Sequence, residues 1–252
     1  GFGKAIAQRC AAEGAAVAIT SRTLTELERT EAELQAAGGK ALAVRADVAR
    51  PEEVARVVRT TSEQLGPIDL FINNAGIPGP FAPLWAVDPN EWWFAQEVHT
   101  RAFFQFLHAL LPSMIERRTG RIIAVSAIAS YRVDFAMSAY CVGKTAQNRL
   151  VQFVAEEVRP FGISAFAIDP GFVITELAEI TMRDPGAQRW KPEMLDHLKA
   201  RKADAASVQD LDRCAQRCVD LASGRYDALS GGYFELHEDL DALLERARAA
   251  KP

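Results

Sequence analysis

Short apolar runs alternate with amphipathic stretches along almost the whole chain. The runs have strand length and the stretches between them have helical periodicity; the runs cover residues 15–20, 41–45, 68–72, 121–126, 163–168 and 228–236. Repeated strand–helix units predict an α/β fold, a single-domain Rossmann-type doubly wound parallel sheet with helices on both faces. Ligands of such sheets bind at the carboxyl ends of the strands, so the residues that directly follow these runs are candidates for a functional site.

Two of the predicted helices carry clear start signals. Thr23-Leu24-Thr25-Glu26 reads as a capping box, and Asp88-Pro89-Asn90-Glu91 combines an N-cap, a proline at the first helical position and a reciprocal Glu. The predicted helices cover residues 4–13, 23–37, 51–65, 88–117, 137–158, 208–222 and 240–249. Residues 175–206 are predicted to be polar and irregular. The tail 237–252 is predicted to be helical, since Leu240, Leu243 and Leu244 recur at helical spacing. It could pack on its own subunit or on a neighbour, and packing on its own subunit is favoured.

Composition excludes several classes of function. A chain of 252 residues that is 49% hydrophobic suits one domain over 1–252. A net charge of -4 gives no reason to expect nucleic-acid binding, and the apolar runs are too short to cross a membrane. Four scattered cysteines form no disulfide framework, which indicates a reducing, cytoplasmic compartment. Cys214 and Cys218, at i, i+4, could share a metal, but two buried small hydrophobes are favoured, and no metal site is predicted.

The chain opens at Gly1-Phe2-Gly3, just before a predicted helix. Such a turn lets phosphate oxygens approach the backbone and the N-terminus of the helix. A parallel sheet of this kind needs a strand ahead of the turn. We therefore expect the first strand, the start of the glycine motif and any targeting signal to precede Gly1.

Residues after the next three strands bear on the binding and choice of cofactor. Ser21-Arg22 supplies a hydroxyl and a guanidinium where an acidic residue would meet a free ribose 2′-hydroxyl, so NADP is favoured over NAD. The alternative is that Arg22 is a solvated loop residue. Asp47-Val48 is a candidate for the adenine edge, or else only the approach to the helix at Pro51. Asn73-Asn74-Ala75-Gly76 ends a strand with small residues, against which a flat ring can lie.

Tyr140 and Lys144 lie four residues apart in a predicted helix, which places both side chains on one face. A phenol has a pKa of about 10 and is a poor acid near neutrality. A cation beside it favours the phenolate and lowers that pKa. Although the spacing alone is common in helices, the pair predicts a proton donor and acceptor that works near pH 7.

The order of Asn73-Asn74-Ala75-Gly76, Tyr140-x-x-x-Lys144 and Pro170-Gly171-x-x-x-Thr175 resembles the short-chain dehydrogenase/reductase family. The resemblance covers residue 1 to about residue 236. It implies that Tyr140 is the general acid/base and that Lys144 holds the nicotinamide ribose. It also implies that residues 175–206 are the substrate-binding lid and that the cofactor is lined by Asn74, Ala75, Gly76, Ile168, Pro170, Gly171, Val173 and Thr175.

Two departures from the family pattern concern the catalytic residues. Ala127 stands where the family has a Ser that hydrogen-bonds the substrate oxygen, and Ser126 replaces it only if the strand end bulges. Loss of such a donor costs about 10²- to 10³-fold in rate. His99 stands where the family has an Asn that supports a proton relay to the Lys. His99 is therefore either a proton shuttle or a filler of space at a helix irregularity.

The resemblance predicts an NADP(H)-dependent oxidoreductase that interconverts a ketone and a secondary alcohol, attenuated by Ala127. Two alternatives stay open: reduction of an imine or a C=C bond, and a non-catalytic NADP-binding regulator. The substrate is expected to be a hydrophobic or aromatic carbonyl or alcohol, and the assembly a homodimer or homotetramer. The candidate lining residues are Pro78, Phe81, Trp85, Ile128, Tyr131, Phe135, Met182, Trp190, Met194 and Leu195.

Overall fold

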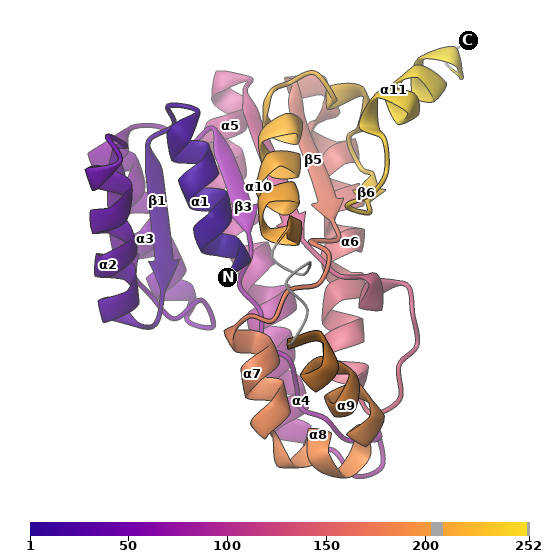
Figure 1. Ribbon diagram of the computed structural model, residues 1–252. Helices are drawn as coiled ribbons and strands as arrows, with labels where there is room; N and C mark the ends of the chain where they lie inside the picture. Colours follow the sequence, from indigo (N-terminus) through magenta and orange to yellow (C-terminus); the bar gives the residue numbers. More distant parts are fainter. Residues whose placement is uncertain (203–208, 251–252) are drawn as a thin grey trace.

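Parallel strands form the centre of the computed structural model, which describes residues 1–202 and 209–250 (Figure 1). One hydrogen-bonded group pairs β1 (Val17–Ser21) with β2 (Ala41–Arg45). The other group runs in the order β3 (Leu70–Asn73), β4 (Gly120–Val125), β5 (Ile163–Ile168) and β6 (Tyr233–Phe234). The last strand is shorter than predicted, because Asp227–Leu229 turns as a 3₁₀ helix and Gly231 takes a φ of 92°.

Helices cover both faces of the sheet, which confirms the doubly wound α/β class. On one face, α3 (Pro51–Leu65), α5 (Ala102–Arg117) and α6 (Ser138–Val158) share a hydrophobic cluster with the strands. On the other, α1 (Phe2–Ala12) and α10 (Gln209–Ala222) lie side by side over a second cluster (Figure 1). Cys214 and Cys218 are buried in this second cluster. A further helix, α2 (Leu24–Ala36), packs against β1 and β2.

The two clusters fix the direction of side chains along β4. Ile122 and Ala124 belong to the cluster below α5 and α6, whereas Ile123 and Val125 belong to the one below α1 and α10. Because side chains alternate between the faces of a strand, Ser126 continues on the α5/α6 side.

The helix start signals differ in outcome. Asp88 caps α4 (Pro89–Gln96) as predicted, and its carboxylate accepts from Asn90 N at 2.7 Å and Glu91 N at 3.1 Å. Thr23 is the N-cap residue of α2, but its side chain makes no capping hydrogen bond, so the predicted capping box is wrong. Instead the Thr23 N–H donates to the Ser21 hydroxyl at 3.1 Å.

The long helix predicted over 88–117 is interrupted. Residues Glu97–Arg101 form a π-helical turn between α4 and α5, and His99 lies within it. Single π turns are rare and often occur at functional sites. This π-helical turn packs against α6, and His99 lies against Gly143 of that helix.

The prediction of an irregular segment over 175–206 is wrong for the part that the structure describes. Residues 176–202 form three short helices, α7 (Glu176–Arg183), α8 (Pro185–Trp190) and α9 (Pro192–Lys202). They build a third hydrophobic cluster with Phe81, and Asp184 caps α8 with a hydrogen bond from Ala187 N at 2.8 Å. Residues 203–206 of this segment, and Val208 at the predicted start of α10, lie outside the described residues. We call α7, α8 and α9 the lid helices.

The tail packs on its own chain. Helix α11 (Leu240–Ala249) starts at the N-cap Asp239, and Leu240 and Leu244 are buried in the second cluster. This confirms the expected packing for the described residues, while 251–252 lie outside them. Among those same residues, no helix has the length and apolar character that would let it span a bilayer.

Candidate active site

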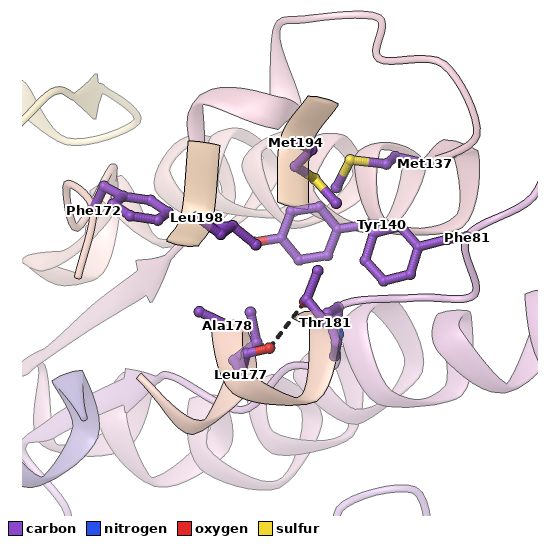
Figure 2. Close-up of a pocket in the computed structure, with 10 residues that line it drawn as sticks. Phe81, Met137, Tyr140, Phe172, Leu177, Ala178, Thr181, Met194 and Leu198 are labelled. Carbon is purple, nitrogen blue, oxygen red and sulfur yellow. Dashed lines mark hydrogen bonds between the residues drawn. The ribbon is translucent and has the colours of Figure 1, made fainter. Parts of the chain in front are cut away.

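An apolar cavity of about 130 Å³ lies between the lid helices and the N-terminal end of α6. Tyr140 is the one ionisable side chain among the described residues that line it. Figure 2 shows the Tyr140 ring between Phe81 and Leu198. The Thr181 hydroxyl, the other polar group here, donates to Leu177 O at 2.9 Å. The full lining is Pro78, Phe81, Met137, Tyr140, Phe172, Leu177, Ala178, Thr181, Met194 and Leu198.

Lys144 lies one helical turn after Tyr140, as the spacing predicts, with its ammonium 5.8 Å from the centre of the Tyr140 ring. Its side chain is buried, and Nζ donates to Val125 O at 2.8 Å and to Gln147 Oε1 at 3.2 Å. Burial lowers the pKa of Lys144 to about 8, because a charged amine loses hydration there. At neutral pH the group is therefore mostly a buried cation beside the phenol.

The expected lowering of the Tyr140 pKa is corrected by the structure. Burial, the dominant cause, and the carboxylate of Asp169 both raise the pKa of Tyr140 above the usual value for a phenol. The Lys144 ammonium lies over the Tyr140 ring and donates to Val125 O and Gln147 Oε1, not to the phenol oxygen. Its charge therefore does not offset the effect of burial on the Tyr140 pKa when no ligand is bound. In this state Tyr140 holds its proton at neutral pH and is a donor.

His99 is completely buried and stacks edge-on against Tyr140, with ring centroids 5.4 Å apart. Its Nε2 lies 2.9 Å from Ile77 O. A carbonyl only accepts, so Nε2 carries the proton and Nδ1 is left as an acceptor. Burial lowers the pKa of His99 to about 3, with the nearby Lys144 cation acting in the same direction. His99 is thus a neutral acceptor near pH 7, and its role as a proton shuttle stays a prediction.

Gly143 on α6 makes room for His99. A Cβ on Gly143 would lie 2.7 Å from His99 Cβ and 3.0 Å from its Cγ, closer than atoms can approach. The glycine and the π-helical turn therefore let an imidazole fit here. The alternative that His99 fills space at a helix irregularity is consistent with this packing.

Ser126 and Ala127, at the end of β4, differ in exposure. Ser126 is only 2% exposed, its hydroxyl has no hydrogen-bond partner among the described residues, and it does not line the cavity. The structure therefore gives Ser126 no route to a substrate in that cavity. Ala127 is half-buried and extended, with φ -168° and ψ 157°.

The predicted cofactor segments come together at the carboxyl ends of the strands. A Cβ on Gly1 would lie 3.6 Å from Thr175 Cγ2, and one on Gly3 would lie 2.8 Å from Asn74 Nδ2. Phe2 begins α1, so its N-terminus opens at this point. A Cβ on Gly76 would lie 3.1 Å from His99 Cε1 and 3.8 Å from Lys144 Nζ. Glycine thus keeps this turn, with Ala75, open toward His99 and Lys144.

The remaining segments behind β5 have different surroundings. Gly171 takes a φ of 75°, a conformation that favours glycine, and Asp169 accepts from its N–H at 3.0 Å. Pro170 and Val173 are buried in the turn, whereas Ile168 is completely buried in the second cluster and does not face a ligand there.

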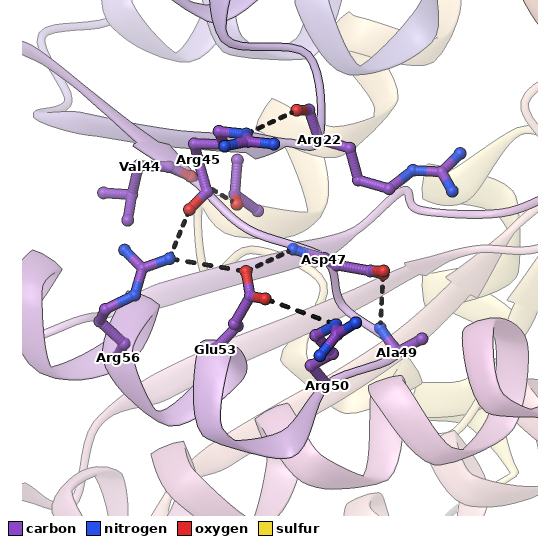
Figure 3. A network of polar contacts seen from close by, with 9 residues as sticks. Arg22, Val44, Arg45, Asp47, Ala49, Arg50, Glu53 and Arg56 are labelled. Carbon is purple, nitrogen blue, oxygen red and sulfur yellow. Dashed lines mark hydrogen bonds and ion pairs between the residues drawn. The ribbon is translucent and has the colours of Figure 1, made fainter.

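Arginines gather at the ends of β1 and β2 (Figure 3). Arg45 Nε donates to Arg22 O at 3.0 Å, and the Arg22 side chain extends away from Glu53, with no ion pair among the described residues. The Ser21 hydroxyl is engaged in its own turn with Thr23. Asp47 Oδ1 accepts from Ala49 N at 3.1 Å, and Val48 packs on the first cluster. These contacts are consistent with the approach to the helix at Pro51, and the adenine-edge role stays a prediction.

A profile of the short chain dehydrogenase family matches residues 1–185. The chain belongs to this family. A short chain dehydrogenase of Pseudocercospora fijiensis is 32% identical over 252 residues, covering 98% of this chain and 80% of the relative. The short chain dehydrogenase citE of Monascus ruber is 30% identical over 200 residues, which cover 79% of this chain but only 62% of citE.

Solved structures of the family agree with the fold. A single-residue variant of the actinorhodin polyketide ketoreductase, in a crystal structure with NADPH, is 25% identical, with a TM-score of 0.81 over 93% of this chain and 91% of that chain. The enzyme KRED1-Pglu is 27% identical, with a TM-score of 0.81 over 93% and 95%. Membership makes this chain an oxidoreductase and confirms the expected Rossmann-type class.

Several residues of this short chain dehydrogenase were not found from the sequence. Gln147, Asp169 and Arg45 all contact predicted site residues. Asp169 directly follows β5, so the strand-end rule could have found it. Gln147 follows Lys144 at i, i+3 on the same helix, so helical spacing could have found this contact, whereas its contact with His99 O depends on the packing of α6 on the π-helical turn.

The predicted lining residues of the lid separate into three groups. Pro78, Phe81 and Met194 line the cavity. Met182 and Leu195 instead belong to the cluster inside the lid, and Ile128 lies in a 3₁₀ turn away from the lining. The aromatic residues Trp85, Tyr131 and Phe135 are exposed, and Trp190 packs edge-on against Phe135.

Proposed function

We propose that the chain is an NADP(H)-dependent oxidoreductase that interconverts a ketone and a secondary alcohol, with Tyr140 as the proton donor and acceptor. One observation carries this proposal: Tyr140 is the single ionisable group among the described residues lining an apolar cavity, and Lys144 is buried directly behind it. A substrate oxygen in this cavity has one group from which to receive a proton.

The residues at the strand ends fit a nicotinamide dinucleotide. Side chains at Gly3 and Gly76 would fill the space over Asn74 and over Lys144, and the N-terminus of α1 offers free N–H groups to phosphate. Gly1, Phe2, Gly3, Asn74, Ala75, Gly76, Pro170, Gly171, Val173 and Thr175 would hold the cofactor, which when bound exchanges a hydride with the substrate carbon. NADPH accompanies the related polyketide ketoreductase, which supports NADP here.

The protein's own part in the reaction is positional and acid–base. Tyr140 donates its proton to the substrate oxygen during reduction and takes it back during oxidation. Lys144 provides a fixed positive charge near the phenol. The lid helices and Phe81 form an apolar wall of the cavity, against which the apolar part of the substrate would pack.

The lining supports a compact apolar substrate, such as an alkyl or aromatic ketone. Its polar groups are the Tyr140 hydroxyl and the Thr181 hydroxyl, and the latter is engaged with the backbone. A charged or heavily hydroxylated substrate would leave polar groups unpaired in this lining, which is costly.

The test is an assay of NADPH consumption with a panel of alkyl, aromatic and carboxylated ketones. We expect turnover with the apolar ketones and little with the carboxylated ones. NADPH binding without turnover of any carbonyl, imine or activated C=C substrate would instead support a regulator, an alternative that Ala127 favours. Turnover of imines or C=C bonds alone would assign a different bond to the same site.

Replacing Arg22 by Ala is expected to weaken NADPH binding about 10- to 100-fold and to leave NADH binding nearly unchanged. The physical reason is that Arg22 is free to make a charge-assisted hydrogen bond with the 2′-phosphate, a group that NADH lacks. The measurement is the Kd of each cofactor by calorimetry. Arg50→Ala, at the start of α3 and paired with Glu53, is the matched control. Equal losses for both cofactors would contradict the assignment.

We also propose that the chain forms a homodimer through α4, α5 and α6. Trp93, Phe104 and Phe153 are 64%, 49% and 57% exposed, and the first two line a surface groove with Leu150. Glu97 and Arg101 form the rim with opposite charges, so a two-fold axis would place one copy's Arg101 near Glu97 of the other copy. The expected result of light scattering is twice the 27.6 kDa chain mass, shifted to monomer by Phe104→Glu. A monomeric wild type would overturn this.

The scattered cysteines form no disulfide framework, so a cytoplasmic location stays our expectation.

A further inference from the structure

The buried ammonium of Lys144 is held by two acceptors of the chain. Nζ donates to Val125 O at 2.8 Å, at the end of β4, and to Gln147 Oε1 at 3.2 Å, one helical turn further along α6. An ammonium carries three protons, so one remains for a ligand. Lys144 is 3% exposed and Gln147 is not exposed at all, which means that bulk water does not replace either acceptor.

The orientation of the Gln147 amide is fixed by its second contact. Its Nε2 donates to His99 O at 2.8 Å. In the reversed orientation the amide NH₂ would face the Lys144 ammonium, so that two donors would meet. The amide oxygen would then face His99 O, so that two acceptors would meet. Gln147 therefore connects the Lys144 ammonium to the backbone of the π-helical turn Glu97–Arg101.

We propose that Gln147 is a positioning residue that holds the Lys144 ammonium in place and in its charged form beside Tyr140. The proposal rests on the proposed function, since it matters to catalysis only if Lys144 supports Tyr140. Burial already brings the pKa of Lys144 down to about 8, so the charged form is only moderately favoured at neutral pH. The loss of one of its two acceptors would lower this pKa further and bring the neutral amine to about half of the group or more at neutral pH.

Other charged groups around Lys144 do not replace this contact. Asp169 acts on Lys144 from the end of β5 and raises its pKa through charge, but its carboxylate accepts from Gly171 N and from the Tyr233 hydroxyl. His99 faces Lys144 from the π-helical turn and is neutral near pH 7. Cys141 and Tyr140 on α6 itself are also neutral there, since burial raises the pKa of both.

The test is the titration of Lys144 in Gln147→Met and Gln147→Glu, followed by the ¹³Cε resonance of labelled lysine and assigned with Lys144→Arg. Met has a similar length and no hydrogen-bonding group of comparable strength. A lost hydrogen bond to a charge corresponds to about one pKa unit or more, so we expect the pKa to fall by that amount. Glu keeps an acceptor toward the ammonium and adds a charge, so there we expect the pKa to rise.

Gln96→Met is the matched control. Gln96 is also a buried glutamine that bonds across to α6, with Nε2 donating to Ala139 O at 2.8 Å, but it does not contact Lys144. It should lower stability similarly and leave the Lys144 titration unchanged. In the turnover assay, Gln147→Met should reduce kcat about tenfold at pH 8, and the reduction should shrink as the pH is lowered.

An unchanged Lys144 titration in both Gln147 variants would overturn the proposal, and so would an equal change in Gln96→Met. If Gln147→Met does not fold, the rise expected in Gln147→Glu decides the question alone. The titration needs no turnover. Absence of carbonyl reduction in the wild type would therefore contradict the proposed function while the titration still measures the role of Gln147 toward Lys144.

Discussion

Tyr140→Phe is expected to reduce NADPH-dependent carbonyl reduction by about 10²- to 10⁴-fold, the range of positioned general acid catalysis. The phenol is the one ionisable group among the described lining residues, so its loss leaves the substrate oxygen without a protein proton donor there. The ring remains, with its edge-on contact to His99, so packing and cofactor binding should change little. The measurement is kcat, with the NADPH Kd and Tm determined on the same samples.

Tyr131→Phe is the control for this result. Tyr131 is 61% exposed and packs edge-on against Tyr233. The variant therefore loses a phenol hydroxyl that lies outside the cavity. It should keep wild-type kcat. If Tyr140→Phe retained full activity with folded protein, the assignment of Tyr140 as the proton donor would fall, whatever the cofactor.

Local sequence signals predicted the fold well where burial and chain direction decide it. The bounds of β2, β5, α3 and α11 match the predicted ranges, because these segments combine a clear apolar pattern with distinct flanking residues. The lid was misread because its helices are short and half polar, although Asp184-Pro185 repeats the start signal of Asp88-Pro89. The Thr23 signal failed for another local reason: a neighbouring hydroxyl, Ser21, took the N–H of Thr23.

The site was predictable in its parts and not in its energetics. The spacing of Tyr140 and Lys144 placed both on α6, and the strand-end rule brought Gly3 to Asn74 and Gly1 to Thr175. The direction of the Tyr140 pKa was wrong, because a sequence shows which charges are near in the chain but not how deeply a phenol is buried. The i, i+3 spacing of Lys144 and Gln147 is visible in the sequence, but the hydrogen bond from Gln147 to His99 O, 48 residues away, could not be found without the structure.

Ala127→Ser is expected to raise kcat for ketone reduction by about 10²- to 10³-fold, which is the worth of one preorganised hydrogen bond to a developing oxyanion. Ala127 is half-buried and extended, precedes a 3₁₀ turn, and occupies the position at which the resemblance to the family places a Ser. The residue before it, Ser126, already has a hydroxyl, but that side chain is buried. The measurement is kcat and KM for the best apolar ketone.

Ala129→Ser, two residues further in the same 3₁₀ turn, is the control and should leave the rate unchanged. A gain confined to Ala127→Ser would identify a reductase that works below its capacity because one donor is missing. If the wild type turns over ketones and Ala127→Ser does not raise kcat, the substrate oxygen is already hydrogen-bonded by another group.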